Sequence, residues 1–184
     1  MMNRLSPPIS PRDHVVGSDS APVSLVEFGD YECGFCGAAQ PIVREVVRRL
    51  ARRLLFGFRH FPMSQAHPHA LQAAVAAEAA GAQGKFWAFH ETLFANQHAL
   101  ETEDLLGYAQ ALDLDLERFE DDLASEVTLA KVRSDFMSGV RSGVNGTPTF
   151  FIDEVRYDGR WDLEALTGAL DRTLAGKTLT PSQP

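Results

Sequence analysis

Two cysteines, Cys33 and Cys36, stand three positions apart where an apolar, β-branched run gives way to an amphipathic helical pattern. Such a change is typical of a buried strand followed by a helix. The N-terminus of a helix offers unpaired N–H groups and about half a positive charge, which stabilise a thiolate. Cys33 would lie at this end, and Cys36, one turn inside, would be shielded. One acidic, accessible thiol beside a shielded one is what a redox-active dithiol requires.

Two other interpretations of the cysteine pair are open. The pair could form half of a structural zinc site with His67 and His69, although their H-x-H spacing is unusual and no second cysteine pair is present. The two cysteines could also be unrelated buried side chains. We favour the redox pair, because two cysteines rarely fall by chance where a strand meets a helix. On this interpretation we predict no bound metal and no cofactor.

Two further motifs contain residue types suited to such chemistry. Glu27 lies in the apolar run before the cysteines, where it could be either a buried carboxylate or an outward-facing one. Pro148 stands in Gly146-Thr147-Pro148, immediately before another apolar run. It is either an edge feature of a strand or a cis proline that turns the Thr147 backbone toward an extended substrate. The residues themselves leave both choices open.

The rest of the chain supplies the elements that must position these residues. Apolar runs predict strands at residues 14–17, 23–28, 55–61, 149–152 and 155–157. Helical patterns cover residues 36–55, an alanine-rich stretch after residue 66, and residues 85–94, 102–112, 115–137 and 162–174. This order predicts an α/β protein with one small sheet, interrupted by a helical insertion.

Aromatic and histidine side chains of the helical block are expected to be structural. The core of the insertion should contain Phe86, Trp87, Phe89 and Phe94, some of which could also line an apolar groove beside Cys33. His60, at the end of a core strand, is expected to be a hydrogen-bonded structural histidine. The other histidines of this region are expected at the surface or as helix caps: His67, His69, His90 and His98.

Composition and charge narrow the range of partners. The 184 residues fit one domain, or one domain with an insertion. With 17 Lys and Arg against 25 Asp and Glu, the net charge is −8. We therefore expect no nucleic-acid partner, because binding to phosphates requires a basic face. No apolar run approaches the roughly 20 residues of a membrane span, so we expect no membrane insertion, and we expect a monomer.

The two ends of the chain are expected to be flexible. Residues 1–13 contain three prolines and predict an arm without regular structure, and residues 176–184 predict a frayed tail. The N-terminal residues have no apolar segment typical of a secretory signal. As written, the chain is expected in the cytoplasm, and in the periplasm or elsewhere outside the cytoplasm if a signal has been removed.

Three stretches together resemble the DsbA-like thioredoxin-fold thiol–disulfide oxidoreductases. They are Val-Glu-Phe-Gly-Asp-Tyr-Glu-Cys-x-x-Cys at residues 26–36, the long helical insertion, and Gly-Val-Asn-Gly-Thr-Pro-Thr-Phe-Phe-Ile at residues 143–152. The resemblance implies a thioredoxin fold with a helical insertion between an N-terminal βαβ unit and a C-terminal ββα unit. The implied boundaries are residues 14–64 and 141–175 for the two parts of the fold, and residues 65–140 for the insertion.

The resemblance also implies roles for the candidate residues. Cys33 would be the exposed nucleophile, Cys36 the resolving thiol, and Glu27 a buried acid that takes the resolving thiol's proton if burial raises its pKa. A cis Thr147–Pro148 bond would face the cysteines, and we predict that Thr147, Pro148 and Phe35 contact the substrate. The implied partners are protein thiols or disulfides and an unidentified redox partner.

The dipeptide between the cysteines departs from the family pattern. Strongly oxidising members have Pro-His there, and the histidine helps to hold the thiolate. This chain has Gly34-Phe35, with no charge and no hydrogen-bonding side chain, so we predict a weaker oxidant, intermediate between those members and thioredoxin. Two rival functions stay open: a zinc-stabilised interaction domain, and a glutathione-dependent isomerase or transferase on the same architecture.

Overall fold

The computed structural model describes residues 4–178, which form a five-stranded sheet and its helices. In chain order the elements are β1 (His14–Gly17), β2 (Val23–Gly29), α1 (Gly34–Leu50), β3 (Leu54–His60), α2 (Ala70–Ala82), α3 (Phe86–Ala95), α4 (Thr102–Ala111), α5 (Leu116–Leu123), α6 (Glu126–Arg141), β4 (Thr149–Ile152), β5 (Val155–Tyr157) and α7 (Leu163–Thr178). The strand order is β1-β3-β2-β4-β5. Only β2 and β3 run parallel among these neighbours. The predicted α/β class, with helices inserted between a βαβ unit and a ββα unit, is confirmed.

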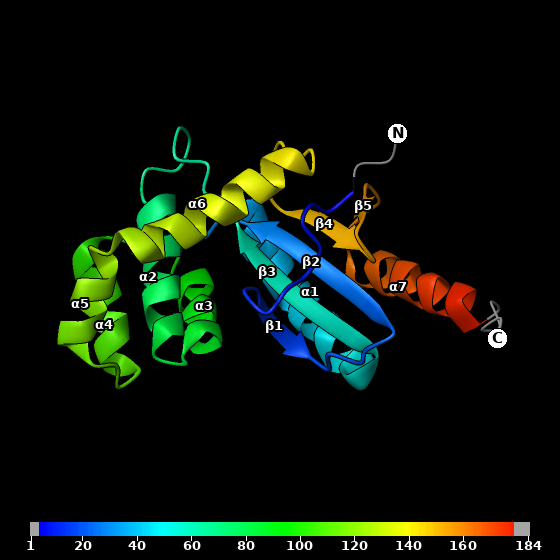
Figure 1. The fold of residues 1–184 in the computed structure, drawn as a ribbon, viewed down its shortest axis with the longest axis horizontal. Coiled ribbons are helices and arrows are strands. Elements are labelled where there is room, and N and C mark those ends of the chain that lie inside the picture. The colour runs from blue at the N-terminus through cyan, green and yellow to red at the C-terminus, as the bar shows by residue number, and fades with distance from the viewer. Residues whose placement is uncertain (1–3, 179–184) are drawn as a thin grey trace.

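The inserted helices lie to one side of the sheet. Helices α2 to α5 are grouped there, and α6 runs from them back across the end of the sheet near β4 (Figure 1). Helices α1 and α7 pack against each other and against the sheet. None of the helices formed by residues 4–178 combines the length and the apolar character that crossing a membrane requires.

The central strand β2 is buried on both faces, and its alternation decides where Glu27 points. Val23 and Leu25 belong to the larger core that contains the apolar face of α1, whereas Val26 and Phe28 belong to the smaller core on the other face. Because successive side chains of a strand point to opposite faces, Glu27 shares the α1 face with Val23 and Leu25. Glu27 is therefore a buried residue, 3% exposed, and its side chain lies on the side of the sheet that carries the cysteines.

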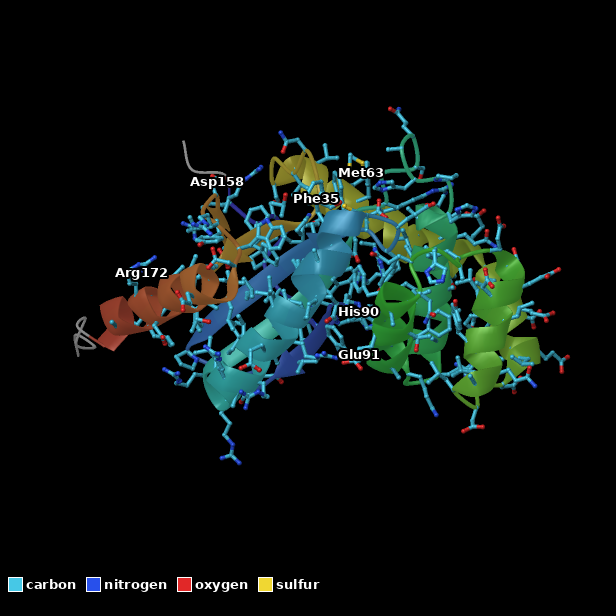
Figure 2. The ribbon with its side chains drawn as sticks, turned by 180° about the vertical axis from the view of Figure 1, so that it is seen from behind. Phe35, Met63, His90, Glu91, Asp158 and Arg172 are labelled. Atoms are coloured by element: carbon cyan, nitrogen blue, oxygen red, sulfur yellow. The ribbon has the colours of Figure 1, made fainter. Side chains whose placement is uncertain are left out.

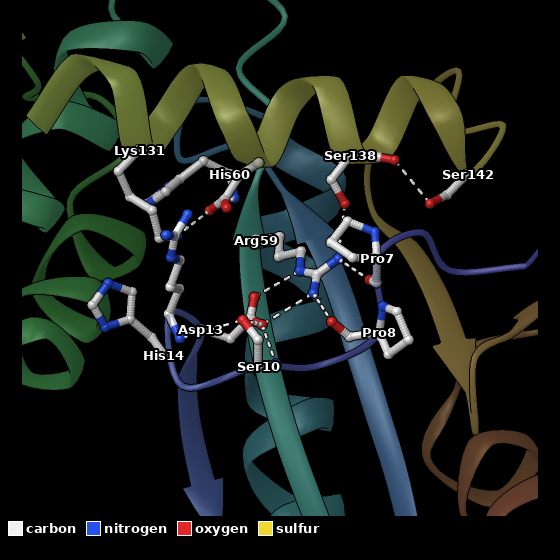
Figure 3. A network of polar contacts seen from close by, with 12 residues as sticks. Pro7, Pro8, Ser10, Asp13, His14, Arg59, His60, Lys131, Ser138 and Ser142 are labelled. Carbon is white, nitrogen blue, oxygen red and sulfur yellow. Dashed lines mark hydrogen bonds and ion pairs between the residues drawn. The ribbon is translucent and has the colours of Figure 1, made fainter. Parts of the chain in front are cut away.

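Residues 4–13 are docked on the sheet, so the flexible arm that we predicted is wrong for them. Leu5 is buried, and its N–H donates to the carbonyl of Glu154 at 2.7 Å. The guanidinium of Arg59, on β3, is buried and makes five hydrogen bonds, which matches its five N–H donors. Its acceptors are both carboxylate oxygens of Asp13, the carbonyls of Pro7 and Pro8, and the hydroxyl of Ser138 (Figure 3). Residues 1–3 of the predicted arm lie outside the described residues.

The helix that we predicted over residues 115–137 is two helices, because Ser125 starts a new one. Its hydroxyl accepts a hydrogen bond from the N–H of Val127 at 3.2 Å, which caps α6. Asp115 caps α5 in the same way. The last helix continues to Thr178 and so includes the first residues of the predicted tail. The remainder of that tail, residues 179–184, lies outside the described residues.

Candidate active site

Cys33 is the N-cap residue of α1, and Cys36 lies one turn inside the same helix. Both are free thiols. Cys36 is fully buried, so the outer position belongs to Cys33, the order that the helix geometry predicts. However, Cys33 is only 5% exposed and is less open than we predicted. The cause is the Thr147 carbonyl, which lies 3.4 Å from the Cys33 sulfur.

Several hydrogen-bond donors converge on Cys33 and favour its thiolate. The largest effect comes from the Cys36 thiol, and partial burial opposes it. The side chain of Thr147 and the backbone N–H groups of Cys36 and Phe35 add further hydrogen bonds. Together they lower the pKa of Cys33 to about 5. The backbone donors are the free N–H groups that a helix presents in its first turn.

The pKa values of Cys36 and Glu27, which lie beneath Cys33, are raised, whereas that of Cys33 is lowered. Burial, the hydrogen bond to Cys33 and the charge of Glu27 raise the pKa of Cys36 well above its usual range. Burial and then the Cys33 charge raise the pKa of Glu27 to about 8. Its register partners, Phe58 on β3 and Phe150 on β4, are both buried aromatic residues that offer no compensating charge. The Glu27 Oε1 atom has no hydrogen-bond partner among the described residues.

The Thr147–Pro148 segment meets the cysteines because β2 and β4 are antiparallel. Phe28 is paired with Thr149, so the chain leaving β2 and the chain entering β4 lie at the same end of the sheet. The Thr147–Pro148 peptide bond is cis. Phe35, the other predicted contact residue, is 69% exposed beside this segment and projects at the end of the sheet where Met63 also lies (Figure 2).

Asp30 organises the turn before Cys33, a role that the sequence did not predict. Its carboxylate accepts hydrogen bonds at 2.8 Å from the N–H groups of Glu32 and Met63. The same carboxylate lies 2.8 Å from Nδ1 of His67. Asp30 therefore ties the loop between β3 and α2 to the turn that carries Cys33. The spacing of an Asp three residues before a cysteine gives only a weak signal of this role.

Gln97, in the segment after α3, is a second missed residue. Its Nε2 donates to the carbonyls of Tyr31 at 2.8 Å and Cys33 at 2.9 Å. A Cβ at Gly37 would lie 2.0 Å from the Gln97 side chain, so a larger residue there would displace the Gln97 amide. Nothing in the local sequence around Gln97 predicts this contact with residues more than 60 positions earlier.

His90 is buried, which contradicts our expectation of a surface position. It shares a 3.0 Å hydrogen bond with the hydroxyl of Tyr31, and burial, with the charges of His60 and His14, lowers its pKa to about 3. His60 is bound to Glu78 at 2.8 Å, as expected of a structural histidine. His90 comes from α3 and faces the α1 side of the sheet, next to Glu91 (Figure 2).

An apolar groove of about 740 Å³ lies near the site, but the aromatic residues that we predicted do not line it. Phe86 and Phe89 are buried in the core of the insertion instead. The lining comes from the loop after β3, from the first turn of α2 and from α6, and includes Phe61, Met63, Leu71, Phe136 and Met137. Met63 lies against Thr147, with 3.9 Å between Sδ and Oγ1, so the groove borders the cysteine pair.

The histidines proposed as zinc ligands bind carboxylates. His67 lies against Asp30, and His69 against Glu32 and Glu101. Within residues 4–178, the group spaced closely enough to hold a metal ion is His60, Glu78 and Asp135, which contains neither cysteine. The ammonium of Lys131 already lies 2.6 Å from Asp135 and 3.6 Å from Glu78. The geometry therefore does not favour a zinc site on the cysteine pair.

We expect Cys33 in the reduced protein to ionise with a midpoint near pH 5. Thiolate absorbance in the ultraviolet, followed across a pH titration, measures this midpoint. A Cys33→Ser variant is the control, since it should lose the transition. A midpoint near the ordinary thiol value of about 8.5 would contradict the arrangement of donors described above.

Comparisons with known proteins place this geometry in a family. The family model described as Thioredoxin matches residues 10–172. The chain belongs to the thioredoxin family. A thioredoxin-like oxidoreductase from Silicibacter pomeroyi DSS-3 is 28% identical, with a TM-score of 0.81 over 90% of this chain and 94% of that one. The predicted thioredoxin fold is thereby confirmed.

Two further thioredoxin-fold structures show the same architecture at lower identity. BdbD from Bacillus subtilis is 24% identical, with a TM-score of 0.82 over 95% of this chain and 98% of that chain. Wolbachia pipientis alpha-DsbA1 is 20% identical, with a TM-score of 0.81 over 97% of this chain and 98% of that chain. Both structures share the fold of this chain, so the predicted resemblance to DsbA-like proteins is confirmed at the level of the fold.

Curated relatives at higher identity than these structures bear a different kind of name. A Salinispora arenicola protein named Na(+)/H(+) antiporter NhaA 1 is 46% identical over 175 residues, which is 95% of this chain. A Herminiimonas arsenicoxydans protein named Na(+)/H(+) antiporter NhaA is 40% identical over 173 residues, which is 94% of this chain. The chain spans only 27% of the length of either relative. The similarity therefore concerns a thioredoxin-like portion of those proteins.

Proposed function

We propose that this thioredoxin-family chain exchanges disulfides with protein substrates through the Cys33-Gly34-Phe35-Cys36 motif. The observation that carries the proposal is the placement of two neighbouring thiols, one at the N-cap of α1 and the other buried one turn inside the same helix. Cys33 is held as a thiolate with a pKa of about 5, while the buried Cys36 beneath it is held as a thiol. A nucleophile and a resolving thiol differ in this way.

The proposed reaction has two exchange steps. The Cys33 thiolate attacks a substrate disulfide, which forms a mixed disulfide and releases one substrate thiolate. Cys36 then gives its proton to Glu27 and attacks the Cys33 sulfur, which releases the second substrate thiolate. The products are a Cys33–Cys36 disulfide and a reduced substrate, so two electrons pass from the cysteine pair to the substrate. The same steps in reverse oxidise a substrate dithiol.

Glu27 suits the proton transfer because its pKa of about 8 lies near neutral pH. A general base is most effective when its pKa is close to the working pH. The unpartnered Oε1 atom leaves one side of the carboxylate free to accept a proton from Cys36, directly or through a water molecule.

Thr147, Pro148 and Phe35 are the proposed substrate contacts. The Thr147 backbone lies beside the Cys33 sulfur, where an extended polypeptide could pair with it as an added strand. Phe35 is an exposed aromatic residue next to the nucleophile. The apolar groove bordered by Met63 could receive an apolar side chain of the substrate. These features favour a polypeptide over a small polar thiol as substrate.

The proposal extends to the oligomeric state, the redox partner and the compartment of the chain. We propose a monomer without a cofactor or metal, a redox partner that resets the cysteine pair, and fold boundaries at residues 14–64, 65–140 and 141–175. The compartment decides the direction of electron flow. A reducing cytoplasm favours reduction or isomerisation of the substrate, whereas an oxidising compartment favours disulfide formation. We do not propose ion transport, since the similarity to the antiporters covers 27% of their length.

The test is equilibration of the pair with glutathione at defined ratios of its two forms. We expect reversible opening and closing, with a potential between about −270 mV for thioredoxin and about −120 mV for DsbA. The reason is that neither Gly34 nor Phe35 has a side chain that donates to the thiolate. A potential equal to that of the strong oxidants would contradict the role given to this dipeptide. Stoichiometric zinc with no redox cycle would instead support the interaction domain.

A further inference from the structure

A histidine from a segment far along the chain reaches the turn that carries the nucleophile. The dipeptide between the cysteines has no ionisable side chain, but the loop from β3 to α2 brings His67 to the turn before Cys33. Nδ1 of His67 lies 2.8 Å from Oδ2 of Asp30. The backbone of the same Asp30 accepts a hydrogen bond from the Cys33 N–H at 3.2 Å. One residue therefore connects the histidine to the nucleophile.

The surroundings of His67 favour its charged form. The charged groups that act on it are Asp30, Cys33 and Glu32, all in the turn between β2 and α1. Partial burial lowers the pKa of His67, but the hydrogen bond and charge of Asp30, followed by the charges of Cys33 and Glu32, leave that pKa raised. The His67 side chain keeps 25% exposure, so its proton can exchange with solvent.

An electrostatic interaction between two ionisable groups acts equally on both. If the Cys33 thiolate stabilises protonated His67, protonated His67 stabilises the Cys33 thiolate by the same free energy. His69, two residues on, provides a contrast. It is paired with Glu32 and Glu101, and the hydrogen bonds and charges of these two carboxylates raise its pKa.

We propose that His67 is a positioning residue for the redox pair: from the β3–α2 loop, anchored on Asp30, it supplies the positive charge beside Cys33 that Gly34 and Phe35 cannot supply. The inference rests on the proposed function and deepens it. Two-electron reduction of the Cys33–Cys36 disulfide creates a thiolate at Cys33 and, with one proton, a thiol at Cys36. The new thiolate then makes His67 hold its own proton more tightly.

Titration of the histidines by NMR in the reduced and the oxidised protein tests this coupling. We expect the pKa of His67 to be higher in the reduced protein by roughly half a unit to one unit, because a partly exposed charge pair is partly screened. His69 should shift much less and serves as the internal control. Equal values for His67 in the two redox states would overturn the proposal.

Substitutions give a second readout on the thiolate itself. His67→Gln retains a hydrogen bond to Asp30 but no charge, and should raise the Cys33 midpoint by roughly half a unit to one unit, a three- to tenfold loss of thiolate stabilisation. His67→Lys should recover most of this shift, and His69→Gln should leave the midpoint unchanged. A midpoint unaffected by His67→Gln, in a protein that still equilibrates with glutathione, would refute the role of His67 alone. Failure to equilibrate at all would refute the proposed function.

Discussion

Replacing Cys36 with alanine should abolish turnover and leave substrates attached to Cys33 as mixed disulfides. The Cys33 thiolate can still attack, since its backbone and Thr147 hydrogen bonds do not depend on Cys36. The second step has no attacking thiol, so the mixed disulfide persists. The variant loses the donor with the largest effect on Cys33, and we therefore expect a higher Cys33 pKa and slower attack, but not its loss.

Non-reducing electrophoresis after incubation with a disulfide-containing protein measures the trapped complex. Cys33→Ala is the matched control, because it removes the nucleophile and should trap nothing. The outcome also distinguishes the proposed dithiol mechanism from a glutathione-dependent enzyme. A glutathione-dependent enzyme would keep its turnover without Cys36 when glutathione is supplied, and such a result would contradict a dithiol mechanism.

The sheet could be predicted from local patterns because its strands are short apolar runs bounded by turn residues. Asp153 and Glu154 both adopt positive φ values, 46° and 68°, in the tight turn that separates the predicted hairpin strands. The helix boundary at Ser125 was missed although a serine is a common helix cap. The apolar pattern on its two sides did not mark the break, and a cap alone is a weak signal.

The docked N-terminal segment could not be predicted from composition. Prolines and serines exclude a regular element, but they do not exclude contact with a buried partner. That partner is Arg59, which follows an apolar run and whose five hydrogen bonds depend on residues before and after β3. A buried arginine needs such acceptors, so its position in a core strand was an available sign that some other segment must cover it.

The active site, too, contains residues that local sequence predicts and residues that it does not. The cysteine pair and its place at a helix N-terminus follow from adjacent residues, whereas Glu27 was undecided from alternation alone and needed the family resemblance. Asp30 and Gln97 were missed, and the contact of His67 with Asp30 was not predicted, because these contacts join segments 30 to 70 positions apart. Long-range hydrogen bonds of this kind leave no periodic pattern in the sequence.

Replacing Glu27 with leucine should slow the resolving step and at the same time stabilise the fold. General-base catalysis by a positioned side chain contributes roughly a hundredfold or more, so we expect mixed disulfides to resolve about 100 times more slowly. The stabilisation follows from burial, because Glu27 places an unpartnered carboxyl oxygen beside Phe58 and Phe150. Leucine has a similar volume and needs no hydrogen bond.

The stability effect has a definite pH dependence. The pKa of Glu27 is raised from 4.5 to about 8 in the folded protein, so the folded state binds its proton more tightly than the unfolded state does. Protonated Glu27 therefore makes its full contribution to the free energy of unfolding below pH 4.5. This contribution is lost as the pH rises through 8. The shift corresponds to a ceiling of roughly 5 kcal/mol.

Denaturant unfolding of the oxidised protein at several pH values isolates the effect of burial, the larger cause of the shift, because a disulfide removes the charge of Cys33. We expect the difference in unfolding free energy between Glu27→Leu and the original chain to be small in acid and to grow toward pH 8, with Glu27→Gln between the two. The effect on the resolving step is measured separately, as the rate at which a preformed mixed disulfide at Cys33 is released. Slow release without added stability would mean that Glu27 is not buried as a lone carboxyl group. Added stability with normal release would mean that the proton of Cys36 leaves by another route.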